Sequence, residues 1–178
     1  MATTLTTPAL ILKRHNYRET DRIVTLITQP WGKVTVIAKG ARKLLSSKLG
    51  LLEPGNIIKG HFVETKSMPL LTQADIINPA YTGASTLEQL RNLQLTLELF
   101  DRVLVEEEIQ ENLFEHILAI RNQAIDIASN RGMVRHHFDV LLTELGYPSL
   151  DQSDYSSITE YVADITEKPL RSWEFLSS

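Results

Sequence analysis

Basic side chains, which bind phosphate groups, are concentrated in the first part of this 178-residue chain. Residues 1–75 contain eleven Lys and Arg against five Asp and Glu, whereas the remainder contains seven against seventeen. Arg grips phosphate oxygens through a planar fork, and surfaces rich in Arg and Lys attract polyanions. The positive part is therefore predicted to bind a polyanion, and the negative part to fold separately and contact proteins.

The candidate phosphate contacts fall in predicted strands and one loop. They are Lys13, Arg14, Arg18, Arg22, Lys33, Lys39, Arg42, Lys43 and Lys48. Tyr17 and Trp31 lie among them as candidates for stacking on bases, since a positive groove with flat rings suits single-stranded nucleic acid. The alternatives are core packing for the rings and an ordinary solvated surface for the charges. No base-reading side chain is identified, so binding is predicted to be independent of base sequence.

Residue sets for catalysis or metal binding are not identified. Without cysteine there is no disulfide or thiolate site. His136 and His137 are adjacent on a predicted helix, so they point about 100° apart and cannot chelate one ion together. The consecutive glutamates 106–108 diverge in the same way, and Gly32-Lys33 lacks the spacing of a nucleotide-binding loop. We expect a binding protein with no catalytic residue, no metal and no cofactor.

The elements that must position the cations are predicted to be strands. Short β-branched runs cut by Gly, Pro and Asn indicate five of them. They are Ala9–Leu12, Arg22–Thr28, Gly32–Lys39, Asn56–Thr65 and Leu70–Ile77. Residues 29–32 are predicted to form a hairpin turn, and residues 40–55 a loop or a short helix. Five short strands favour a closed barrel, because an open sheet this small would leave unprotected edges.

After Asn78-Pro79 the apolar period changes to that of helices. Helices are predicted at about 87–104, 109–128 and 133–145, with a short one at 170–176. Ser85 or Thr86 would cap the first, and Gly146 would end the third. The expected fold is α+β, with a barrel domain at residues 1–80 and a helical domain at residues 81–178 that contacts proteins and braces the barrel. No apolar stretch approaches the roughly 18 residues of a membrane span, so we expect a cytoplasmic protein without membrane contact.

The run from Arg18 to Lys43, RETDRIVTLITQPWGKVTVIAKGARK, resembles the N-terminal signature of the DNA repair protein RecO family. The matching elements are Glu19-Thr20-Asp21, Gly32-Lys33 and residues 38–42 (AKGAR). Leu52-Glu53-Pro54 and residues 71–74 (LTQA) follow in the expected order, and residues 99–104 resemble the start of the family's helical region. The resemblance covers the first 105 residues well and the next forty more loosely.

The resemblance implies an N-terminal OB-fold that binds single- and double-stranded DNA, followed by a helical domain. It implies annealing of complementary strands and, with the partner RecR, assistance in loading RecA onto DNA coated by single-strand-binding protein, whose C-terminal tail is contacted. It also implies a role in DNA repair, recombination and the DNA damage response, and a nucleoid-associated location. By motif position, the implied DNA contacts are Arg22, Lys33, Lys39, Arg42 and Lys43.

The resemblance ends near Tyr147, where many family members carry a four-cysteine zinc module. This chain has no cysteine, which indicates a zinc-free branch or a C-terminal part that has been lost. In the acidic half, Arg121, Arg131 and Arg135 form a candidate patch for an acidic protein tail. The alternative is that they are scattered surface arginines.

Two other functions remain open from the residues alone. One is an adaptor whose barrel binds an acidic protein, and the other is an OB-fold protein that binds RNA. Neither accounts for the motif at residues 38–42, so both rank below the repair function.

Overall fold

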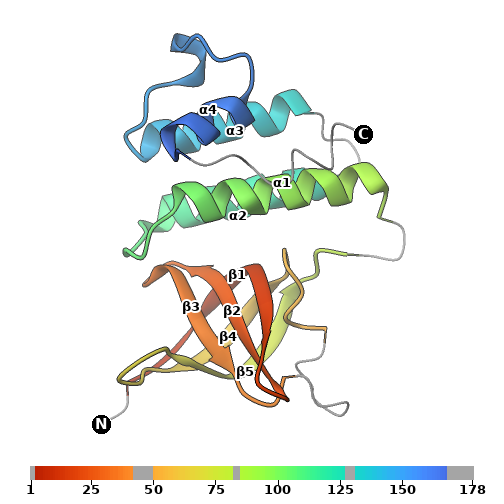
Figure 1. Cartoon of the computed structure of the whole chain (residues 1–178), viewed down its shortest axis with the longest axis vertical. Coiled ribbons are helices and arrows are strands. Elements are labelled where there is room, and N and C mark those ends of the chain that lie inside the picture. The colour runs from red at the N-terminus through yellow and green to blue at the C-terminus, as the bar shows by residue number, and fades with distance from the viewer. Residues whose placement is uncertain (1–2, 42–49, 82–84, 127–130, 168–178) are drawn as a thin grey trace. The chain divides into compact units, whose positions relative to one another are not determined.

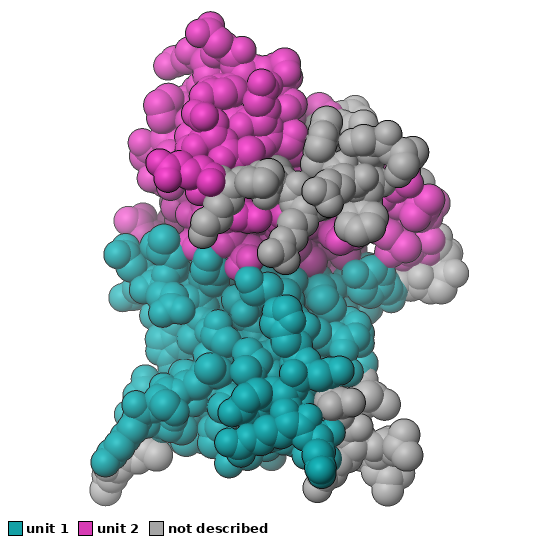
Figure 2. Space-filling model, in the orientation of Figure 1, with its two compact units in different colours: residues 1–83, 105–109 teal, residues 84–104, 110–178 magenta. Residues whose placement is uncertain are grey.

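The computed structural model describes residues 3–41, 50–81, 85–126 and 131–167, and for residues 131, 133 and 134 it describes the backbone alone (Figure 1). The chain divides into two compact units. Unit 1 consists of residues 1–83 and 105–109, and unit 2 of residues 84–104 and 110–178 (Figure 2).

Unit 1 is a closed five-stranded barrel of OB type, as predicted. Its strands are β1 (Thr4–Tyr17), β2 (Asp21–Thr28), β3 (Gly32–Ala38), β4 (Ile57–Val63) and β5 (Leu70–Asn78). They are hydrogen-bonded in the closed order β1-β2-β3-β5-β4. All pairs are antiparallel except β3 with β5, which meet in parallel at Ile37 and Leu70.

Closure of the barrel depends on β1, which is much longer than the predicted Ala9–Leu12. Its first part, Thr4–Leu10, pairs with β4, and its second part, Ala9–Tyr17, pairs with β2. A register shift lies between Ile11 and Lys13. An extra residue at such a bulge bends a strand and increases its twist, which allows one strand to serve two neighbours.

Apolar side chains at alternate positions of the strands fill the inside of the barrel. Val24 and Leu26 of β2, Val36 and Ala38 of β3, and Phe62 of β4 belong to one buried cluster. Burial of a side chain of this kind is worth about 1.5–3 kcal/mol. Gly60 leaves room for the Phe62 ring, because a Cβ at residue 60 would lie 2.4 Å from it.

A short segment beyond the first helix also belongs to unit 1. The Lys33 amide donates to the Val105 carbonyl at 3.0 Å, and the Ile109 amide donates to the Gln29 carbonyl at 2.8 Å. Residues 105–109 therefore run along the β2–β3 hairpin. Gly32 makes room for them, since a Cβ there would lie 2.0 Å from the Glu107 carbonyl oxygen. The predicted boundary at residue 80 did not include this return of the chain to the barrel.

Unit 2 is helical. The described helices are α1 (Leu87–Val103), α2 (Glu111–Ile125), α3 (Arg131–Glu144) and α4 (Ile158–Ile165), with a 3-10 turn at Leu150–Gln152. Thr86 caps α1 in a reciprocal capping box with Gln89. Phe100 of α1 packs against Phe138 of α3 with ring centroids 5.2 Å apart. The structure thus has the predicted α+β class.

One helix of the structure was not predicted. Helix α4 was missed because the sequence around it is polar and acidic, although Ser157 caps it and Tyr161 and Val162 are buried. The short helix predicted at residues 170–176 lies outside the described residues. No helix in the described part of the chain combines the length and apolar content that crossing a membrane requires.

Candidate nucleic-acid interface

The strand register divides the candidate cations between the two faces of the barrel wall. Val24, Val36 and Ala38 point into the barrel, so side chains opposite them in the register share that inner face. Arg14 lies opposite Val24, and Arg22 lies opposite Ala38, which puts both arginines on the inner face. Residues one position away lie on the outer face.

The outer face of β1, β2 and β3 carries rows of cross-strand neighbours. Lys13 lies opposite Thr25, and Thr25 lies opposite Thr35, with their hydroxyl oxygens 3.4 Å apart. The next row begins with His15, which is exposed, and the strand ends at Tyr17. Positions 13, 15 and 17 therefore place a lysine, a histidine and a tyrosine along one line. His15 was not among the predicted contacts, although the alternation that places it on this line is visible in the sequence.

The turn between β1 and β2 gathers cationic groups around one carboxylate. The Arg18 guanidinium lies over the Tyr17 ring, 5.1 Å from its centroid, in cation–π geometry. The Gly40 amide donates to the Asp21 carboxylate at 2.8 Å and lowers the pKa of Asp21. The charges of Arg18 and Lys39 act in the same direction, so both lie near this carboxylate. Asp21 thus connects the β1–β2 turn to the end of β3.

The motif at residues 38–42 has a physical explanation in this arrangement. Ala38 and Ala41 are fully buried in the barrel cluster. Gly40 has a φ of +64°, a conformation that glycine adopts without strain. Lys39 is exposed between these fixed neighbours. The motif therefore holds one lysine outward at the end of β3.

Arg14 and Arg22 lie toward the end of the barrel that holds the β1–β2 turn, but their side chains are on the inner face. The Arg14 Nη2 donates to both Glu53 carboxylate oxygens, at 2.7 and 2.6 Å. Arg22 is only 8% exposed. Arg14 therefore has a structural partner in the loop before β4. This pairing was not predicted, although Glu53 belongs to the Leu52-Glu53-Pro54 motif. For both arginines, positioning of this end of the barrel fits the geometry better than direct contact with a ligand.

Lys33 lies at the opposite end of β3 from Lys39. At about 3.3 Å per residue, six residues of strand separate them by roughly 20 Å. Lys33 is half-buried, and its amide pairs with Val105, directly before three consecutive glutamates. The structure therefore separates Lys33 from Lys39. Arg42, Lys43 and Lys48 lie outside the described residues.

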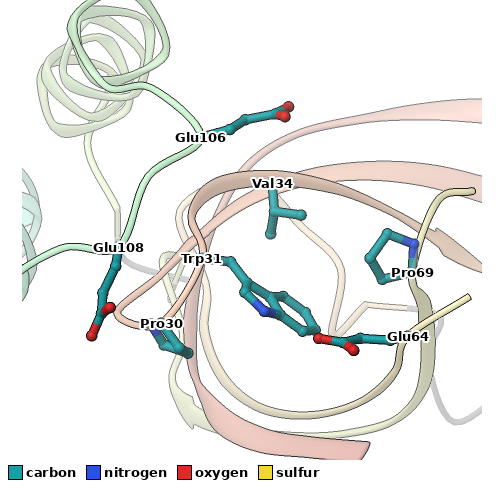
Figure 3. Close-up of a pocket in the computed structure, with 7 residues that line it drawn as sticks. All are labelled: Pro30, Trp31, Val34, Glu64, Pro69, Glu106 and Glu108. Atoms are coloured by element: carbon teal, nitrogen blue, oxygen red, sulfur yellow. The ribbon is translucent and has the colours of Figure 1, made fainter. Parts of the chain in front are cut away.

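Trp31 lies away from the group at the β1–β2 turn. Its ring meets Phe62 edge-on, with centroids 5.5 Å apart, and it packs against the barrel cluster. Figure 3 shows it among Pro30, Val34 and Pro69, with Glu64, Glu106 and Glu108 at the same pocket. Packing against the core, the alternative weighed for this ring, fits this geometry better than stacking on bases.

The arginines proposed as an acidic-tail patch in unit 2 are not gathered there as an open surface. Arg121 is fully buried, and its Nη1 donates to Asn122 Oδ1 at 2.8 Å. Arg135 lies 3.4 Å from an Asp151 carboxylate oxygen. The side chain of Arg131 lies outside the described set. Because Arg121 has no exposed surface, it cannot receive a peptide tail in this structure.

A known protein family matches the part of the chain that forms the barrel. Residues 1–80 match the family model described as "Recombination protein O N terminal". The matched segment contains all five strands, the β1–β2 turn and the motif at residues 38–42.

Curated relatives extend the similarity into the helical unit. A DNA repair protein RecO of Geobacter sulfurreducens is 32% identical over 162 residues, which is 90% of this chain and 66% of that protein. The Myxococcus xanthus protein of the same name is 36% identical over 107 residues, covering 60% of this chain and 44% of its own length. For the Syntrophomonas wolfei protein the values are 28% over 144 residues, 80% and 58%. The chain thus spans about half the length of the curated relatives it matches.

Proposed function

The chain belongs to the RecO family of DNA repair and recombination proteins, and from this premise we propose that its barrel binds single- and double-stranded DNA without reading base sequence. The observation that carries the proposal is the group of side chains at the β1–β2 turn and the end of β3. Arg18 and Lys39 are exposed around the fixed Asp21–Gly40 link, and His15 and Tyr17 continue the same outer face. Phosphates and flat bases are the ligands for such a group.

The basic residues 42, 43 and 48 extend this proposed interface along the sequence. They lie three, four and nine positions after Lys39, and the Asp21–Gly40 hydrogen bond fixes the backbone directly before that stretch. Lys13 adds a half-buried cation on the same outer face. The interface is therefore centred on one end of the barrel, and Lys33 is outside its centre.

Salt dependence tests the electrostatic part of the proposal. Each neutralised phosphate of a single strand contributes about 0.7 to the slope of log affinity against log salt concentration. We expect a slope that corresponds to roughly four to six phosphates for a mixed-sequence oligonucleotide, measured by fluorescence anisotropy. The slope and the affinity should be nearly the same for oligonucleotides of different base composition. An isotherm that does not respond to salt would refute phosphate binding as the basis of affinity.

We further propose that the protein anneals complementary strands, without an enzymatic step. Two strands repel one another, and a cationic surface that neutralises phosphates on both lowers this repulsion, while base pairing supplies the specificity. RecR, RecA and the tail of single-strand-binding protein are the proposed partners, by family membership.

An annealing assay on oligonucleotides coated with single-strand-binding protein tests this activity. We expect the full chain to accelerate duplex formation at low salt and to lose this effect as salt rises. DNA binding and strand annealing both depend on neutralisation of phosphates, which salt screens. A side-by-side assay with RNA strands of the same sequence is the control for an RNA-binding function. Acceleration confined to RNA, or no acceleration at all, would contradict the proposal.

A further inference from the structure

The pocket around Trp31 has a composition opposite to that of the proposed DNA interface. Its volume is about 310 Å³, near the lower end of the roughly 300–1,000 Å³ range of small-ligand sites. It is lined by Pro30, Trp31, Val34, Glu64, Pro69, Glu106 and Glu108 (Figure 3). All of these residues belong to unit 1. Four lining residues are apolar or aromatic and three are acidic, with no basic residue among them.

We propose that this pocket binds an arginine side chain presented by an extended segment of a partner protein. An arginine combines an apolar methylene stem with a planar cation. Val34 and the two prolines offer apolar surface to the stem, the Trp31 ring offers a flat π surface to the guanidinium, and the glutamates offer carboxylates for its fork. Phosphates and acidic peptides are excluded by the same three carboxylates.

The pocket is pre-formed in part, because hydrogen bonds of the backbone order the segments that carry Trp31, Pro69 and Glu64. The Trp31 amide donates to the Thr28 hydroxyl at 3.2 Å, and the Ile37 amide donates to the Pro69 carbonyl at 2.9 Å. The Glu64 amide donates to the Thr3 carbonyl at 2.9 Å. A site whose walls are already ordered loses less entropy when it binds than one that must fold around its ligand.

The segment of residues 105–109 supplies two of the three carboxylates. Its hydrogen bonds from the Lys33 amide and to the Gln29 carbonyl hold Glu106 and Glu108 beside the hairpin that carries Trp31. The three glutamates are exposed, and within the described residues none of the ion pairs formed by Arg14, Arg102, His116 or Arg135 involves them. Three exposed carboxylates beside one aromatic ring are complementary in charge to a cationic side chain.

Fluorescence of Trp31 gives a direct test in the full chain. The chain has two tryptophans, so a Trp173→Phe background leaves Trp31 as the reporter. The probe is the capped peptide Gly-Gly-Arg-Gly-Gly, and the matched neutral probe has citrulline in place of arginine. We expect the arginine peptide to change Trp31 emission with saturation, and the citrulline peptide to leave it unchanged at the same concentrations.

A variant that removes the three negative charges tests whether the arginine peptide binds in the pocket. Glu64→Gln, Glu106→Gln and Glu108→Gln together keep side-chain size and should weaken arginine-peptide binding about tenfold, since three partly exposed charge contacts are lost. The control is Glu88→Gln, Glu115→Gln and Glu167→Gln, three exposed glutamates of unit 2, which changes net charge equally and should leave binding unchanged. Equal weakening in both variants, no weakening in the first, or equal responses to the two peptides would overturn the proposal. DNA affinity of the pocket variant should not fall, so this outcome is independent of the proposed DNA interface.

Discussion

At the scale of single residues, the best-defined feature of the barrel is the Asp21 carboxylate. It accepts the Gly40 amide, and its lowered pKa shows that the folded protein favours its charged form. Stability contributed by this group is present above its ordinary pKa of 3.8 and is lost as pH falls through the folded-state value. At neutral pH the carboxylate therefore holds the β1–β2 turn and the end of β3 together.

A second residue-scale feature, in unit 2, is the histidine group between α2 and α3. The His137 ring lies 5.8 Å from His116 and 5.9 Å from His136, measured between centroids, and His116 Nδ1 lies 3.5 Å from a Glu144 carboxylate oxygen. Burial, followed by the charges of His116 and His136, lowers the pKa of His137 below 6.5. Its neutral form is therefore the one that the folded state favours.

The lowered pKa of His137 predicts that the folded protein loses stability in acid. The unfolded chain takes up a proton on His137 near pH 6.5, before the folded chain does, so the free energy of unfolding should fall as pH drops below about 6.5. Urea denaturation followed by helical circular dichroism at several pH values measures it. In His137→Gln the fall over this range should be smaller, because the titrating group is gone. An identical pH profile in the variant would show that His137 does not contribute.

At the scale of elements, much of the barrel and of unit 2 was predictable from local patterns. Strands β2 to β5 and helices α1 to α3 follow from alternation and helical periodicity, and Thr86 was one of two predicted caps. The full length of β1 was not predictable, because its ends contain Thr, Pro and charged residues that become strand only by pairing with two partners. Lys33 was placed with the other cations by sequence proximity, and only the strand direction shows that it lies far from Lys39.

The return of residues 105–109 to the hairpin was likewise invisible in the sequence. It depends on backbone hydrogen bonds between residues more than seventy positions apart and on an absent side chain at Gly32. Gly32 has a φ of +59°, and any Cβ would collide with the Glu107 carbonyl. The glycine that appears to serve a hairpin turn therefore also permits a close backbone approach.

Substitution of Gly32 tests this element directly. Gly32→Ala should cost about 2 kcal/mol or more, from backbone strain together with the steric clash. It should also remove hydrogen-exchange protection at the Lys33 and Ile109 amides. Gly50→Ala is the control, because its φ of +119° is also strained but nothing lies within 4 Å of the added Cβ. If the Lys33 and Ile109 amides remained protected in Gly32→Ala, the pairing of residues 105–109 with the hairpin would be contradicted.

At the scale of the whole molecule, charge is separated twice. The first separation lies between the basic and acidic parts of the sequence. The second lies within unit 1, where the β1–β2 turn and the end of β3 carry cations, whereas the pocket at Trp31 is lined by Glu64, Glu106 and Glu108. The whole-chain net charge of −4 conceals both separations. The proposed ligands are DNA at the cationic group and an arginine-bearing protein segment at the Trp31 pocket.

Paired charge reversal is the most direct measurement of the central claim, that one end of the barrel binds DNA phosphates. Arg18→Glu with Lys39→Glu should weaken single-stranded DNA binding by about tenfold or more and lower the salt slope by roughly two phosphates, alike for all base sequences. Lys59→Glu with Lys66→Glu changes the net charge equally at exposed positions in and after β4, and should change affinity far less. Equal losses in the two double variants, or full affinity in the first, would contradict the account.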